Sequence, residues 1–130
     1  MSALIEHLKA LPSGTIIYNT SVLGFVPMAA TSVYSATKAA LHSYVLSQRF
    51  KLRNTGVKII ELAPPWVRTD LMNSREAEAA MPLDEFVQGV MKQLGGDAEE
   101  ILVGNAEQLR ANPGPQEGAF VTQFNASLPF

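Results

Sequence analysis

Two short β-prone runs on either side of one long helical pattern constrain the fold of this chain most strongly. Residues 15–22 and 57–63 are rich in β-branched and aliphatic side chains, and the first half of 15–22 is apolar nearly throughout, as in a strand buried on both faces. Between them, residues 33–54 place apolar side chains at helical spacing. A strand, a helix and a strand in this order predict a right-handed crossover and a parallel sheet with helices on its faces.

Weaker patterns predict the rest of the chain. The further expected elements are a helix over 2–11, a short helix over 76–80, a helix from Pro82 to Leu94, a strand over 100–104 and a tail over 105–130 that carries a turn at 112–115 and a stripe of Phe120 and Phe124. Three strands are about half of the roughly six in a complete doubly wound sheet. We therefore expect residues 1–130 to form a single partial α/β domain.

Composition narrows the classes of function. A formal charge of -2 gives no basic field for nucleic acid, and no block of like charge suggests a membrane surface. The absence of cysteine excludes disulfides, thiolate catalysis and cysteine-bound metals, and no His, Asp or Glu cluster implies a metal. The first residues lack a long apolar run, so the sequence predicts a cytoplasmic protein without a signal peptide.

The most informative motif is Tyr34-Ser35-Ala36-Thr37-Lys38, which places a phenol and an ammonium one helical turn apart. A nearby ammonium favours the phenolate electrostatically, which makes a tyrosine usable as an acid or base. This spacing alone also recurs on exposed helices without chemical meaning. Two further features support a site: Ser21 ends the first predicted strand, and Pro64 begins a segment after the second, so both lie where open α/β sheets bind ligands.

With these residues in order, the stretch from Gly14 to Leu71 resembles the catalytic half of the short-chain dehydrogenase/reductase family, whose fold is a Rossmann-like sheet. The resemblance implies that the Ser21 hydroxyl binds the substrate oxygen and that Tyr34 transfers the proton. It implies for Lys38 a hydrogen bond to the nicotinamide ribose of NAD or NADP and activation of the tyrosine.

The segment after the second strand is similar to the family's Pro-Gly-x-Val-x-Thr motif, which contacts the nicotinamide carboxamide. Its counterparts here are Pro64, Pro65, Val67 and Thr69. Proline replaces the usual glycine, which removes a backbone donor and fixes φ at Pro65. Phe25-Val26-Pro27, the Pro-Pro-Trp-Val sequence and Gln123-Phe124-Asn125 resemble the DltE-like oxidoreductase branch of the family.

The family's glycine-rich strand-turn-helix, which holds the pyrophosphate, has no counterpart in this sequence. We therefore expect weak or absent NAD(P) binding by the isolated chain. A sheet cut before residue 15 would also expose a strand edge and apolar helix surface. We expect self-association through the 33–54 helix or the 15–22 strand edge, or a complementing N-terminal fragment.

Several side chains have both a structural and a functional interpretation. Trp66 and Tyr44 favour packing, although Trp66 could border the substrate; His7 and His42 also favour structural roles. Residues 69–81 occupy the position of the family's substrate loop, so Leu71, Met72 and Met81 are candidate pocket residues, and a solvated loop is an equal alternative. Phe120, Phe124 and Phe130 favour docking or core contacts.

Two hypotheses follow for the whole chain. The first is an NAD(P)-dependent oxidoreductase of alcohols or carbonyls, present as its catalytic half. The second is a noncatalytic relative that serves as an oligomeric or interaction module.

Overall fold

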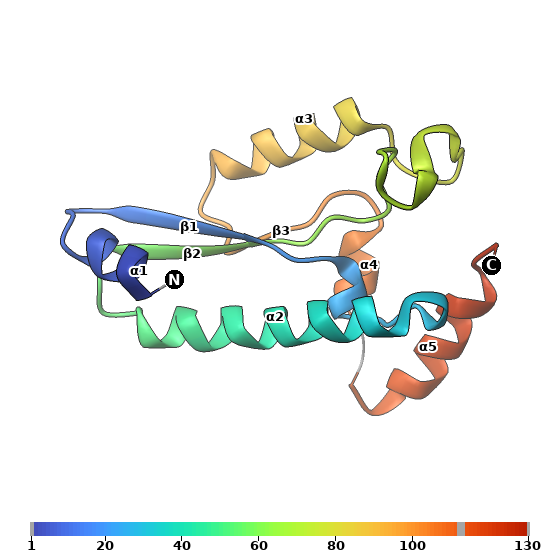
Figure 1. Cartoon of the computed structure of the whole chain (residues 1–130), viewed down its shortest axis with the longest axis horizontal. Coiled ribbons are helices and arrows are strands. Elements are labelled where there is room, and N and C mark those ends of the chain that lie inside the picture. Colours follow the sequence, from blue (N-terminus) through green and yellow to red (C-terminus); the bar gives the residue numbers. More distant parts are fainter. Residues whose placement is uncertain (1, 112–113, 130) are drawn as a thin grey trace.

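The fold is a three-stranded parallel sheet with helices on both faces, seen in a computed structural model that describes residues 2–111 and 114–129 (Figure 1). The strands are β1 (Gly14–Asn19), β2 (Val57–Leu62) and β3 (Glu100–Ile101), in the order β1-β2-β3. The predicted α/β class and the partial doubly wound sheet are therefore confirmed. Strand β1 pairs with β2 along its whole length, with Ile17 opposite Ile60 and Asn19 opposite Leu62.

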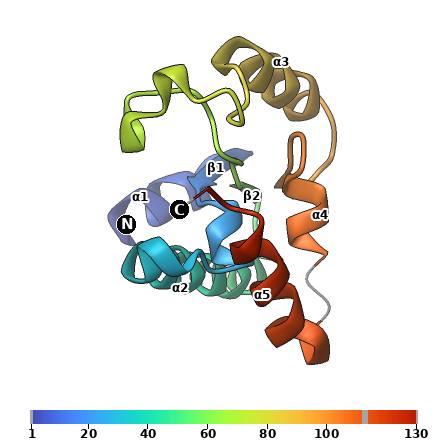
Figure 2. The ribbon, with the colours of Figure 1, turned by 90° about the vertical axis from the view of Figure 1, so that its right-hand side faces the viewer.

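Within the described residues, five α-helices accompany the sheet: α1 (Ser2–Lys9), α2 (Ser32–Lys51), α3 (Leu83–Leu94), α4 (Ala106–Arg110) and α5 (Glu117–Ala126). Helix α2 covers one face and α3 lies over the other (Figure 1). Helices α4 and α5 lie together at one end of the molecule (Figure 2). Short 3-10 turns connect these elements at Val22–Gly24, Ala29–Thr31, Leu71–Glu76 and Gly114–Gln116.

Three apolar clusters form the core. The first joins β1, β2 and α2 through Ile16, Val45 and Ile59, and another joins β2, β3 and α3 through Ile60, Val90 and Ile101. The remaining cluster packs the turn after β1 against α4 and α5, through Val22, Phe25, Val26, Ala63, Ala106, Leu109, Phe120 and Phe124. The carboxyl end of the sheet is thus built against the end of the chain, although more than 80 residues separate Val22 from α4.

The structure corrects several predicted elements. The helix expected over 76–80 is wrong: the helical turn lies at Leu71–Glu76, and it is kinked because Met72 and Asn73 adopt left-handed φ angles of 57° and 56°. The strand predicted over 100–104 ends at Ile101, and the strand predicted over 15–22 ends at Asn19. Helices α4 and α5 were not predicted, and Asn112, Pro113 and Phe130 lie outside the described residues.

Strand β1 is an edge within the described part of the chain, because no second strand pairs with its outer side. Its side chains alternate between buried and exposed, and Ile17 is 45% exposed. Helix α2 also leaves apolar side chains uncovered, namely Val33, Leu46 and Phe50. Among residues 2–111 and 114–129, no helix is both long and apolar enough to cross a membrane.

Candidate active site

The first turns of α2 present Tyr34 and Lys38 together, at the end of the sheet where β1 stops. The Lys38 ammonium lies 5.6 Å from the centre of the Tyr34 ring and donates to the carbonyl of Asn19, the last residue of β1, at 3.3 Å. An ammonium has three donors, so this bond leaves Lys38 capacity for a ligand hydroxyl. Tyr34 is 37% exposed, which leaves its ring accessible from solvent.

Ser21 lies two residues beyond β1, at the start of the turn Val22–Gly24. Its Oγ accepts a hydrogen bond from the amide of Leu23 at 3.1 Å, which caps the turn and fixes the hydroxyl oxygen. A serine hydroxyl can donate its own proton while it accepts this bond. The side chain is therefore oriented and retains a donor for a substrate oxygen.

Gly24 brings this turn against α2. A Cβ at Gly24 would lie 2.8 Å from the carbonyl oxygen of Lys38, so only a residue without a side chain allows the approach. The sequence patterns do not single out this glycine. The close contact joins the segment that carries Ser21 to the part of α2 that carries Lys38.

Ser35 anchors the loop that leads into α2. It is 1% exposed, accepts from the amide of Met28 at 3.1 Å and donates to the carbonyl of Thr31 at 3.1 Å. The side-chain amide of Asn125, on α5, continues this anchoring, because it donates to the carbonyl of Pro27 and accepts from the amide of Ala29. The loop before Tyr34 is thus fixed from both helices.

The proline segment begins where β2 ends and is tied to the turn after β1. The carbonyl of Pro64 accepts from the amide of Val22 at 3.1 Å, and Pro65 is buried. Val67 forms an isolated bridge with Met81, and the Thr69 hydroxyl accepts from the amide of Leu71. Of the four residues expected to contact the carboxamide, the structure thus places Pro64 beside the Ser21 turn and gives Thr69 a local partner.

The predicted substrate residues are only partly brought together. Leu71 and Met72 are 63% and 50% exposed, whereas the half-buried Trp66 donates from its indole nitrogen to Ser74 at 2.7 Å. An open cavity of about 500 Å³ does lie at this loop, lined by Arg68, Thr69, Asp70, Arg75, Glu76 and Leu83. Its lining includes none of Ser21, Tyr34 and Lys38, so this cavity is separate from those three side chains.

The aromatic and histidine interpretations can be compared with the geometry. Phe120 and Phe124 pack against the core cluster at the end of the sheet, as expected for docking or core contacts. Tyr44 remains 40% exposed and meets the Tyr18 ring edge-on. His42 has a specific partner that sequence reasoning missed, the buried Glu61. No pattern signalled that pair, because its members are 19 positions apart on different elements.

Comparison with known proteins identifies the relatives of this arrangement. The family model for the short chain dehydrogenase matches residues 1–80. The uncharacterized oxidoreductase DltE of Bacillus subtilis is 41% identical over 85% of this chain and 46% of its own length. Estradiol 17-beta-dehydrogenase 2 of Mus musculus is 29% identical over 77% of this chain and 28% of its own length.

A solved structure shares the same fold. A short chain dehydrogenase from Burkholderia cenocepacia, determined in complex with NADP, superposes with a TM-score of 0.80 at 24% identity. The superposition covers 94% of this chain and 53% of that one. The chain spans about half the length, or less, of the curated relatives and solved structures it matches.

Proposed function

Because the chain belongs to the short-chain dehydrogenase family, we propose that it supplies the catalytic half of an NAD(P)-dependent oxidoreductase of alcohols or carbonyls. The observation that carries the proposal is the Lys38 ammonium, which lies beside the Tyr34 ring and is bonded to the end of β1 two residues before Ser21. One acid–base group, one cation and one oriented hydroxyl come from the adjoining ends of β1 and α2. Together these groups can orient a carbonyl and supply the proton for its reduction, whereas the hydride must come from a cofactor.

In this proposal each side chain has a separate task. The Ser21 hydroxyl donates to the substrate oxygen and orients it, and the Tyr34 phenol delivers a proton to that oxygen during reduction or removes it during oxidation. The Lys38 ammonium stabilises the phenolate that remains after proton delivery. When bound, the nicotinamide would exchange a hydride with the substrate carbon.

The described residues fit only the nicotinamide end of that cofactor. Lys38 retains donors for a ribose hydroxyl, and Pro64, Pro65, Val67 and Thr69 are the residues that would receive the carboxamide. The sequence contains no glycine-rich turn for the pyrophosphate, so weak NAD(P) binding is expected from these residues alone. Trp66, Leu71 and Met72 are the proposed substrate neighbours.

The test adds an N-terminal half from a relative and removes the proposed proton donor. The chain is fused to the N-terminal half of the Bacillus subtilis relative, and NADH and NADPH oxidation is followed with a panel of carbonyls. We expect Tyr34→Phe to abolish turnover while cofactor fluorescence still reports binding. Tyr44→Phe is the matched control, because Tyr44 is a similarly exposed tyrosine on the same helix and should leave turnover intact.

Two results would contradict the proposal. A folded fusion that binds NADH or NADPH but reduces no carbonyl would remove the assigned activity. Full turnover by the Tyr34→Phe variant would remove Tyr34 from the mechanism and leave only the family relationship.

A second candidate, an oligomeric or interaction module, is favoured by the exposed apolar surface. Ile17 on β1 and Phe50 on α2 are 45% and 66% exposed, and β1 has a free edge within the described residues. Light scattering of the chain should report a dimer or larger, and Phe50→Ser or Ile17→Asp should weaken association according to which surface is used. A monomer at high concentration would count against this candidate.

A further inference from the structure

A fully buried carboxylate lies behind the site, and the proposed chemistry does not use it. The Glu61 side chain, in β2, is 0% exposed. Its Oε1 accepts from the Thr20 hydroxyl at 2.8 Å, and the Nδ1 atom of His42 lies 2.9 Å from Oε2 and 3.1 Å from Oε1. Burial of a carboxyl group is costly unless hydrogen bonds compensate, so these two partners account for its presence in the core.

The three residues belong to three different segments, and two of these segments carry site groups. Thr20 lies between Asn19, whose carbonyl binds the Lys38 ammonium, and Ser21. His42 lies one turn beyond Lys38 on α2, so it fixes the same helix against β2. A single carboxylate therefore connects the strand end that holds Ser21 to the helix that holds Lys38.

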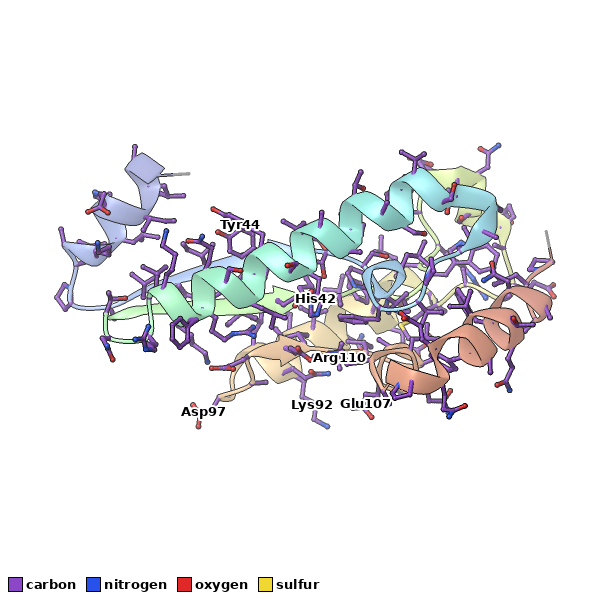
Figure 3. The ribbon with its side chains drawn as sticks, turned by 90° about the horizontal axis from the view of Figure 1, so that it is seen from below. His42, Tyr44, Lys92, Asp97, Glu107 and Arg110 are labelled. Atoms are coloured by element: carbon purple, nitrogen blue, oxygen red, sulfur yellow. The ribbon has the colours of Figure 1, made fainter. Side chains whose placement is uncertain are left out.

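The position of the imidazole is itself restrained. The His42 ring packs edge-on against Phe25, with ring centres 5.0 Å apart, and the same Phe25 ring lies 4.9 Å from the guanidinium of Arg110. Figure 3 shows His42 on the Arg110 side of α2, with Tyr44 on the other side. Arg110 is in turn paired with Glu100 at 2.9 Å. The packing directs Nδ1 toward Glu61, where a protonated Nδ1 donates.

We propose that Glu61 is a positioning residue, which sets Ser21 relative to Lys38 by accepting hydrogen bonds from Thr20 and His42. The inference rests on the proposed function, because it takes Ser21 and Lys38 as the groups to be positioned. Without the carboxylate, the fold retains its strand pairing, but Thr20 loses its link through Glu61 to His42 on α2, and the Lys38–Asn19 hydrogen bond must hold the end of β1 to this helix without that support. The position of Ser21 relative to Lys38 is then less restrained.

The test measures the geometry of the chain itself by NMR and needs no cofactor. Hydrogen exchange of the Leu23 amide, which donates to Ser21 Oγ, reports on the position of the serine. The NMR signal of the Lys38 ammonium reports on its hydrogen bond to the carbonyl of Asn19. In Glu61→Gln we expect hydrogen exchange at Leu23 to accelerate about tenfold relative to the Val90 amide of α3, as for one lost hydrogen bond. The Lys38 signal should broaden or shift with it.

The Thr20 variants keep the idea testable if Glu61→Gln does not fold. Thr20→Val replaces the hydroxyl with a methyl group and should reproduce the Leu23 and Lys38 changes, whereas Thr20→Ser keeps a hydroxyl and should leave both signals as in wild type. Glu99→Gln is the matched control, because Glu99 is an exposed glutamate next to β3 and should change neither signal.

A purely structural role would accelerate Leu23 and Val90 by the same factor. That result, or unchanged Leu23 and Lys38 signals in folded Glu61→Gln or Thr20→Val, would overturn the proposal. These measurements do not depend on hydride transfer. A failure of the proposed function would therefore appear separately, in the turnover of the fusion protein.

Discussion

Strands β1 and β2 pair Ile17 with Ile60, yet only one of these two side chains is covered. Ile60 in β2 is 4% exposed and packs with Val90 of α3 and Ile101 of β3, whereas its partner Ile17 in β1 is 45% exposed. The same side chain, in the same register, thus has two environments. The difference lies in the neighbouring elements, because α3 and β3 cover this face at β2 and no described element covers it fully at β1.

The comparison explains where the candidate site can be well ordered. Its groups lie at the seam between β1 and β2, where the amides of Thr20 and Val22 donate to carbonyls of Leu62 and Pro64. Strand β2 therefore fixes this seam. Asn19, whose carbonyl accepts from Lys38, is the last residue of β1, and Ser21 lies two residues further along the chain. The open edge lies on the other side of β1 and does not reach these bonds.

The largest expected difference between the two positions is the loss of stability when each isoleucine is shortened to alanine. Ile60→Ala removes buried atoms from a packed cluster and should lower the free energy of unfolding by about 2–5 kcal/mol. Ile17→Ala removes half-exposed atoms and should cost less than about 1 kcal/mol. Urea unfolding of both variants measures the difference.

Equal losses would show that Ile17 is covered in solution. Unfolding at several protein concentrations then separates self-association from cover within one chain, because only association makes the midpoint depend on concentration.

Much of the fold and of the candidate site could be predicted from the sequence, and part of both could not. The β-branched runs and the 33–54 periodicity identified β1, β2 and α2, and motif order placed Tyr34, Lys38 and Ser21 at one end of the sheet. The pairing of Glu61 with His42 joins elements through tertiary packing, which no local pattern encodes. The same holds for α4 and α5, which are short and are ordered by contact with the turn after β1.

A second prediction sharpens the role of the seam. Gly24→Ala would place a Cβ 2.8 Å from the carbonyl oxygen of Lys38, which is backbone and cannot move aside easily. We expect a loss of about 1–3 kcal/mol in stability, as for overpacking, with NMR shifts concentrated at Lys38 and Ser21. Gly118→Ala in α5 is the control: nothing lies within 4 Å of its Cβ, and alanine should stabilise the helix slightly.

The smallest expected effect concerns the Glu100–Arg110 pair beside β3 and is tested by pH. The Arg110 guanidinium holds the pKa of the Glu100 carboxyl below its usual value, chiefly through their hydrogen bonds and against the opposing effect of burial. A carboxyl with a lowered pKa stabilises the fold above its ordinary pKa, and that contribution disappears as pH falls through the lowered value.

Because the pair is partly exposed, we expect Glu100→Gln to cost less than about 1 kcal/mol at neutral pH. Wild type and variant should converge in acid, whereas Glu107→Gln, on exposed α4 surface, should match wild type throughout. A difference between wild type and Glu100→Gln that persists in strong acid would mean that Glu100 acts through packing rather than charge.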